Sequence, residues 1–343
     1  MFAKFKSIFG FSNDERSEEV NQPQSSMVDG SEDNACAVTD DAPKVMEHSR
    51  ELTLSFISNL LGVRSLGTEE SHQQERILRA SLDEEMVGLS EESIPKLSKN
   101  ALLLMNDLVN PDTPQSKIVS AIKEDPALAG KVISIANSPA FVGSGVVIQD
   151  LEHALSMLGQ QRLRDVVLSS LVADKFQIDS FYFETFGKAL WDHSSEVANN
   201  AKKICENLGG NPSLAYFVGL IHDVGKLIIF KKLIEIHAVE KQEPHPEVFS
   251  HLLSDFSHAL TRRACEVWEL PEHWCQPITD FQMATENDLK RPESIALFLA
   301  NAYAELHALY REGEITEFEL VWRLQQTGSN IDDFRRLYPQ EED

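Results

Sequence analysis

The segment LAYFVGLIHDVGKLIIF, residues 214–230, is apolar on nearly every side of the helix that its composition predicts. A helix that is apolar all round belongs inside a protein, yet this one carries His222 and Asp223 side by side and Lys226 one turn further on. Burying a carboxylate and an imidazole costs free energy unless the groups are paired or bind an ion. The segment therefore indicates either a metal site or a buried His–Asp–Lys hydrogen-bond set that fixes helix packing.

Two neighbouring helices contribute further histidines. In the helix predicted over residues 190–208, His193 falls on the same apolar stripe as Leu190 and Val197, so we expect it to face the core. A lone histidine on an apolar face is usually a core residue, and only the nearby His–Asp pair favours a role as metal ligand. A long helix after Pro246 adds His258 as a further candidate ligand.

Helix-capping signals recur along the chain, whereas strand signals are scarce. Thr113-Pro114, Asp125-Pro126 and Asn211-Pro212 each place an N-cap residue before a proline at the first helical position. Thr316 with Glu319 matches a capping box. No Asn-Gly or Asp-Gly turn separates alternating apolar runs. The sequence therefore predicts an all-α fold.

The N-terminal 50 residues differ from the rest of the chain. The start, MFAKFKSIFGF, would form a short amphipathic helix with a basic face, able to contact a membrane surface or dock in a groove. A frayed terminus is the alternative, because so short a helix is marginal in water. Residues 12–50 hold ten acidic residues against three Lys and Arg. Such a segment cannot bury enough apolar surface to order itself, so we expect a disordered acidic tail.

Composition excludes several classes of protein. The 343 residues carry a formal net charge of −24, which argues against sequence-independent nucleic-acid binding. The four cysteines form no CxxC and no zinc spacing, and are typical of reduced thiols in a cytoplasmic protein. No uninterrupted apolar run reaches the roughly 18 residues of a membrane span. No GxSxG elbow or glycine-rich phosphate loop is present.

An ordered series of motifs resembles the HDOD domain, the HD-related output domain of bacterial signalling proteins, from about residue 94 to residue 281. The series is Ile94-Pro95, Asp125-Pro126-Ala127-Leu128, Ala136-Asn137-Ser138, Ala154 through Leu158-Gly159, Trp191 with His193-Ser194, Gly219 through Lys226, and Trp268-Glu269-Leu270-Pro271. An isolated His–Asp pair would be weak evidence, but this series covers more than half of the chain.

The resemblance implies a relationship to the HD-superfamily metal-dependent phosphohydrolases. In those enzymes a metal ion lowers the pKa of a bound water, which attacks a phosphate ester. The resemblance makes His193 the first metal ligand, His222 and Asp223 the paired ligands, and His258 a ligand from the following helix. It gives Lys226 a position facing the phosphate.

Two departures from that pattern weaken the implied chemistry. Thr279-Asp280-Phe281-Gln282 stands where many relatives carry a His pair, and Asn301 stands where the enzymes place their last metal-binding Asp. A hard ion such as Mg²⁺ prefers more oxygen ligands than remain here, whereas an ion with imidazole affinity could still bind. We therefore expect no cofactor, and leave open a divalent metal ion held by His193, His222, Asp223 and His258.

The sequence thus predicts a two-lobed helical HDOD protein. We expect a disordered tail over 1–50, a helical linker over 51–89, the HDOD domain over 90–285 with lobes 90–180 and 185–285, and C-terminal helices over 286–343 that complete the HD-like lobe. The predicted function is bacterial signal transduction without catalysis, through a protein partner or a phosphorylated or nucleotide ligand. The alternative is a metal-dependent phosphohydrolase or phosphodiesterase, with His222, Asp223 and Lys226 as catalytic candidates. Nucleic-acid binding is not expected, and residues 1–11 could make peripheral membrane contact.

Overall fold

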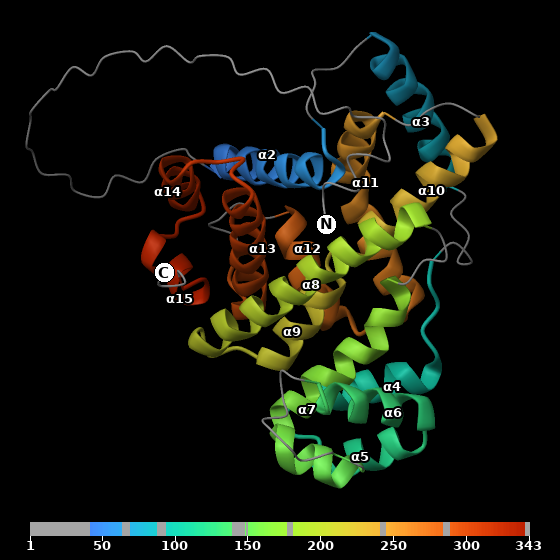
Figure 1. Ribbon diagram of the computed structural model, residues 1–343, viewed down its shortest axis with the longest axis vertical. Helices are drawn as coiled ribbons and strands as arrows, with labels where there is room; N and C mark the ends of the chain where they lie inside the picture. The colour runs from blue at the N-terminus through green and yellow to red at the C-terminus, as the bar shows by residue number, and fades with distance from the viewer. Residues whose placement is uncertain are drawn as a thin grey trace, which may run out of the picture.

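The computed structural model describes residues 42–63, 69–87, 94–138, 148, 150–176, 181–240, 245–283 and 289–339. Every regular element in these ranges is an α-helix, which confirms the predicted all-α class (Figure 1). The helices are α2 (Ala42–Leu61), α3 (Glu69–Val87), α4 (Lys99–Val109), α5 (Gln115–Lys123), α6 (Pro126–Ala136), α7 (Leu151–Phe176), α8 (Phe181–Asn207), α9 (Pro212–Ile221), α10 (Val224–Glu240), α11 (Pro246–Val267), α12 (Glu272–Met283), α13 (Pro292–Arg311), α14 (Glu317–Gln326) and α15 (Ile331–Leu337).

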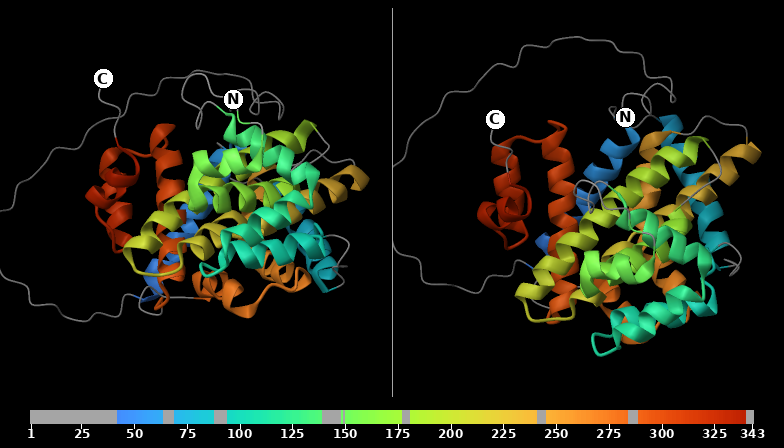
Figure 2. Two further views of the ribbon diagram at one scale, coloured as in Figure 1. Left: turned by 90° about the horizontal axis from the view of Figure 1, so that it is seen from below. Right: turned by 60° about the horizontal axis from the view of Figure 1, so that its bottom comes forward.

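The helices gather in two groups that share one apolar core. Helices α4 to α7 lie together at the lower end of the molecule in Figure 1, and α8 to α13 form the larger upper group. Helix α2 packs against α11 and α13, far from it in sequence. Helices α14 and α15 lie beside α13 on the opposite side from α4 to α7, and a second apolar cluster holds them there (Figure 2).

Helix α2 begins earlier than the expected boundary between tail and linker. It starts at Ala42, so residues 42–50, which the acidic composition assigned to the tail, belong to a helix. Pro43 is the second residue of this helix, in the first turn, where a proline is tolerated because its missing N–H would have no partner in the helix. The amphipathic start over 1–11 and the rest of the predicted tail up to residue 41 lie outside the described residues.

Most of the predicted helix caps are present. The side chains of Asp125, Asn211 and Thr316 accept hydrogen bonds from the first-turn backbone amides, and Thr316 with Glu319 completes the capping box. The prediction for Thr113 was wrong, because Pro114 itself is the N-cap of α5. The carbonyl of Thr113 accepts a hydrogen bond from a different residue, Arg164.

Arg164 ties α7 to the segment that joins α4 and α5. Its guanidinium is almost fully buried, with 2% exposed, and donates to four backbone carbonyls at 2.7–3.0 Å. Those carbonyls belong to Asp107, Leu108, Asn110 and Thr113. Since each buried carbonyl needs a donor, one side chain satisfies the end of α4 and the turn after it.

The predicted single helix over 214–230 is two helices, α9 and α10, which break at His222 and Asp223. Gly225 permits the break, because a Cβ at this position would lie 1.8 Å from the carbonyl oxygen of Ser257. Thr261 satisfies the backbone there: its hydroxyl donates to the His222 carbonyl and accepts from the Gly225 amide, both at 3.0 Å. The break directs the His222 and Asp223 side chains to the same point.

By length and composition, the segment Pro212–Glu235 is long and apolar enough to cross a membrane. An apolar segment of that length was not expected from the sequence. The most apolar stretch of this segment is entirely buried. Neighbouring helices surround α9 and α10, with α8 against α9 and α11 against α10. The apolar character therefore belongs to a pair of core helices.

Candidate metal and ligand site

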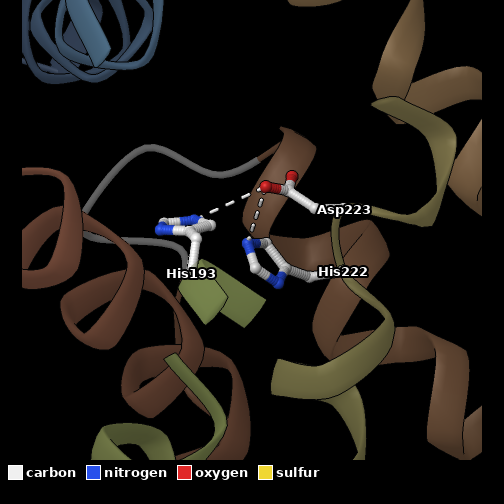
Figure 3. Close-up of side chains that lie close together, drawn as sticks. All are labelled: His193, His222 and Asp223. Atoms are coloured by element: carbon white, nitrogen blue, oxygen red, sulfur yellow. Dashed lines mark ion pairs between the residues drawn. The ribbon is translucent and has the colours of Figure 1, made fainter. Parts of the chain in front are cut away.

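Three predicted site residues meet in the core of the upper helix group. His193 projects from α8, and His222 and Asp223 project from the break between α9 and α10 (Figure 3). Asp223 Oδ2 lies 3.5 Å from His193 Nε2 and 3.4 Å from His222 Nε2. The ligand atoms of the three residues all lie within 4.8 Å of one another. The prediction that His193 faces the His–Asp pair agrees with this geometry.

Asn301 from α13 supplies a fourth atom to the cluster. Its Oδ1 lies 3.2 Å from His193 Nε2 and 3.1 Å from His222 Nε2. The residue is 3% exposed, as buried as its neighbours. The amide therefore stands at the position implied for the last metal-binding carboxylate.

The hydrogen bonds of His222 leave a lone pair facing this cluster. Its Nδ1 lies 2.8 Å from the carbonyl of Gly219, and because a carbonyl only accepts, Nδ1 carries the proton. Burial lowers the pKa of His222, although Asp223 opposes the shift, so the ring is neutral near pH 7. Its Nε2 lone pair then points toward two further acceptor oxygens, those of Asp223 and Asn301. These three acceptors meet His193 Nε2, which either donates its proton to the oxygens or joins the three acceptors around a cation.

Lys226 places the nearest positive charge in the site. Its ammonium donates to Asp223 Oδ2 at 2.7 Å, and the residue is 2% exposed. Burial acts to raise the pKa of Asp223, but His222 and Lys226 together hold that pKa well below its usual value. Asp223 is therefore ionised, and the ammonium charge balances it.

Glu305, one turn beyond Asn301 on α13, brings a second carboxylate that the sequence analysis missed. It is fully buried, hydrogen-bonds to Asn301, and accepts from the hydroxyl of Thr53 at 2.9 and 3.1 Å. Burial raises the pKa of Glu305 to about 7. The sequence signal for Glu305 was its spacing of four residues from Asn301, because residues four apart lie on the same face of a helix.

Helix α2 covers one side of the cluster. The ring of Phe56 lies 4.6 Å from the imidazole of His193, centroid to centroid, and 5.9 Å from the ammonium of Lys226. Thr53, one turn earlier, holds Glu305. No motif in the predicted linker indicated these contacts, because they depend on how α2 packs.

His258 lies near the site but outside the cluster of three. Burial lowers its pKa to about 4, and the charge of Lys226 adds to the effect, so its ring is neutral. The ring packs 5.9 Å from that of Phe281. The structure therefore brings together His193, His222 and Asp223, and leaves His258 as a neighbour of Lys226.

The donor set fits a divalent ion with imidazole affinity. Two imidazole nitrogens, one carboxylate oxygen and one amide oxygen suit such an ion better than Mg²⁺ or Ca²⁺, which take oxygen ligands. A cavity of about 180 Å³ reaches His193 between α2, α8 and α13. Small-molecule pockets usually measure about 300–1,000 Å³, so this cavity admits an ion more readily than a phosphate ester.

Comparisons with known proteins identify the family of the fold. Residues 94–283 match the HDOD domain family. A protein of uncharacterised function from Treponema pallidum (strain Nichols) is 26% identical over 243 residues, covering 68% of this chain and 45% of that protein. Ribonuclease Y of Helicobacter acinonychis (strain Sheeba) is 34% identical over 85 residues, covering 24% of this chain and 16% of the enzyme. The chain thus spans less than half the length of these relatives.

Two solved structures share the fold. An HDOD domain protein of unknown function from Geobacter sulfurreducens superposes with a TM-score of 0.53 at 21% identity, over 78% of this chain and 93% of that one. A Shewanella amazonensis SB2B protein described as a candidate metal-dependent phosphohydrolase superposes with a TM-score of 0.52 at 18% identity. The superposition covers 79% of this chain and 97% of that one. At these identities the likeness concerns the fold alone. The family match spans more than half of the sequence, and this chain belongs to the HDOD family.

Proposed function

We propose that the protein is a regulatory HDOD protein of bacterial signal transduction, which acts by binding a protein partner or a small phosphorylated ligand and does not hydrolyse it. One observation carries the proposal: the side chain that lies against both imidazoles from α13 is the neutral amide of Asn301 and not a carboxylate. Asp223 is then the one ionised ligand among the four atoms, and Lys226 already neutralises it. A neutral amide compensates a dication poorly, so the arrangement suits binding better than turnover.

A divalent ion with imidazole affinity is part of this proposal. His193, His222, Asp223 and Asn301 would hold it, because their acceptor atoms converge. Once bound, such an ion would supply Lewis-acid attraction for an oxygen of a phosphorylated ligand. Lys226 keeps Asp223 ionised, and Glu305 fixes the orientation of the Asn301 amide.

A metal-dependent phosphohydrolase or phosphodiesterase is the second candidate, and the His–His–Asp cluster is the observation that favours it. The Shewanella protein carries that description, and the shared fold makes the same activity testable here. In an enzyme of this kind Asp223 would be indispensable for turnover.

Hydrolysis assays separate the two candidates. Protein loaded singly with Mn²⁺, Fe²⁺, Zn²⁺ or Ni²⁺ would be tested on bis(p-nitrophenyl) phosphate and on cyclic dinucleotides, beside Asp223→Ala. We expect no turnover above that of the variant. Turnover that the variant loses while it remains folded would refute the non-catalytic function.

The proposed setting is the cytoplasm, with peripheral membrane contact through residues 1–11. Deleting these residues should release the protein from vesicles that contain anionic lipid, measured by co-sedimentation. Equal sedimentation of both chains, or of neither, would remove this part of the proposal.

A further inference from the structure

Helix α2 closes the site although it lies outside the matched HDOD region of residues 94–283. It runs across the upper helix group and packs on α11 and α13, as Figures 1 and 2 show. Phe56 lies on the imidazole of His193, and Thr53 bonds to Glu305. Two segments outside the matched region, α2 and α13, therefore contribute to this buried polar cluster.

Few polar contacts hold α2 in place among the described side chains. Thr53 bonds to Glu305, Asn59 donates to Glu312 at 3.1 Å, and Arg50 pairs with Asp255. The Arg50 side chain is 71% exposed, so its pair contributes little. The rest of the attachment is apolar, through side chains that include Leu52, Phe56, Ile57, Leu60 and Leu61. The attachment of α2 to the rest of the molecule is therefore mainly apolar packing against α11 and α13.

The cavity of about 180 Å³ beside the site has an acidic lining. Its floor includes His193, and α2 contributes Phe56, Asn59 and Leu60 to its wall. Asp192, Glu196 and Glu312 line it together with one cation, Arg311. Carboxylates that line the opening of a cavity attract cations. The lining therefore favours the entry of a metal ion over that of an anion.

We propose that α2 is the movable wall of a cation route, so that a divalent ion reaches His193 through this cavity at a rate set by displacement of α2. The inference rests on the proposed binding of an ion by the four-atom cluster. Phe56 blocks the inner end of the route, since its ring lies against the His193 imidazole. An input that pulls residues 42–61 away from α11 and α13 would load or unload the site.

Cobalt capture tests the route. Co²⁺ bound by imidazole and carboxylate ligands absorbs visible light, so stopped-flow absorbance gives its capture and release rates with the full chain. Phe56→Ala should accelerate both rates by about tenfold, because capture through a minor open state scales with the population of that state. The matched control is Phe334→Ala, which removes a phenyl of similar burial, 4% against 5% exposed, from the α14–α15 side. The control should capture Co²⁺ at the wild-type rate.

A second variant tests the proposal independently in case Phe56→Ala does not fold. Thr53→Val removes the hydroxyl that holds Glu305 while keeping the shape of the side chain, and should accelerate capture about fivefold. Equal rates in the wild type and both α2 variants would overturn the proposal. Equal acceleration by Phe334→Ala would also overturn it, since that result means general loosening.

The same samples separate this inference from the proposed function. Fast capture together with bis(p-nitrophenyl) phosphate turnover in Phe56→Ala would support the movable wall and refute the non-catalytic function. Wild-type capture that is already as fast as in the variant, without turnover, would refute the wall and leave the function standing. Failure of every variant to show a Co²⁺ spectrum would refute the wall and the proposed ion together.

Discussion

Replacing Asn301 by Asp should destabilise the metal-free protein, and a divalent ion should reverse the effect. Asn301 Oδ1 lies 3.1 Å and Asp223 Oδ2 lies 3.4 Å from the same nitrogen of His222, which bounds the separation of the two oxygens at about 6.5 Å. At an effective dielectric constant of about 20, two negative charges at that distance repel by about 2.5 kcal/mol. The ionised carboxylate of Glu305 adds to this repulsion at pH 8. A dication bound between the oxygens would convert the repulsion into attraction.

Urea unfolding at pH 8 measures the effect, once with a chelator and once with Mn²⁺. With the chelator, Asn301→Asp should lose at least about 2.5 kcal/mol of unfolding free energy relative to the wild type. Asn199→Asp controls for the added charge, because this exposed residue lies on the outer face of α8. Equal stability of Asn301→Asp and the control in chelator, or no recovery with Mn²⁺, would refute the convergence of acceptors on an ion site.

Three further predictions concern buried groups. Since the folded-state pKa of Glu305 is raised to about 7, this one group contributes about 2 kcal/mol of added stability as pH falls from 8 to 5, and Glu305→Gln should lose that contribution in urea unfolding. Burial lowers the pKa of His193 to about 3 and that of His258 to about 4, so the unfolded chain binds more protons below pH 6.5. Each of these two histidines should therefore cost about 2 kcal/mol of unfolding free energy between pH 7 and pH 5, and His258→Gln should remove one of the two losses. An unchanged dependence of unfolding free energy on pH in His258→Gln would contradict this. Arg164→Met should lower the unfolding free energy by about 3 kcal/mol, because two buried and two partly buried carbonyls lose this donor, and a melting temperature within 2 °C of wild type would contradict it.

The class of fold and three residues of the site could be predicted from local patterns. The apolar run with an embedded His–Asp pair required burial, and the apolar stripe that contains His193 directed that side chain to the core. Asn301 was identified by its position in the HD-type pattern, and the structure places it against both imidazoles. The signal for His193 lies within one helix, where sequence spacing determines direction, whereas the signal for Asn301 came from the family resemblance.

The remaining features depend on packing between distant segments. Glu305 and Thr53 lie 252 residues apart and meet only because α2 docks on α13. The break between α9 and α10 depends on Thr261, whose hydroxyl replaces the lost backbone partners. Apolar periodicity alone predicts one helix there, since it carries no information about a neighbour that satisfies a broken turn.

Metal content tests the central claim most directly: His193, His222, Asp223 and Asn301 form an ion site in a domain that does not hydrolyse phosphate esters. The measurement is elemental analysis of protein purified without an affinity tag or chelator, beside His222→Ala. We predict about one Mn, Fe, Zn or Ni ion per wild-type chain and none in the variant, because the variant loses one of two imidazole ligands. A folded wild-type protein free of these metals would contradict the account and make the His–Asp–Lys set a purely architectural one.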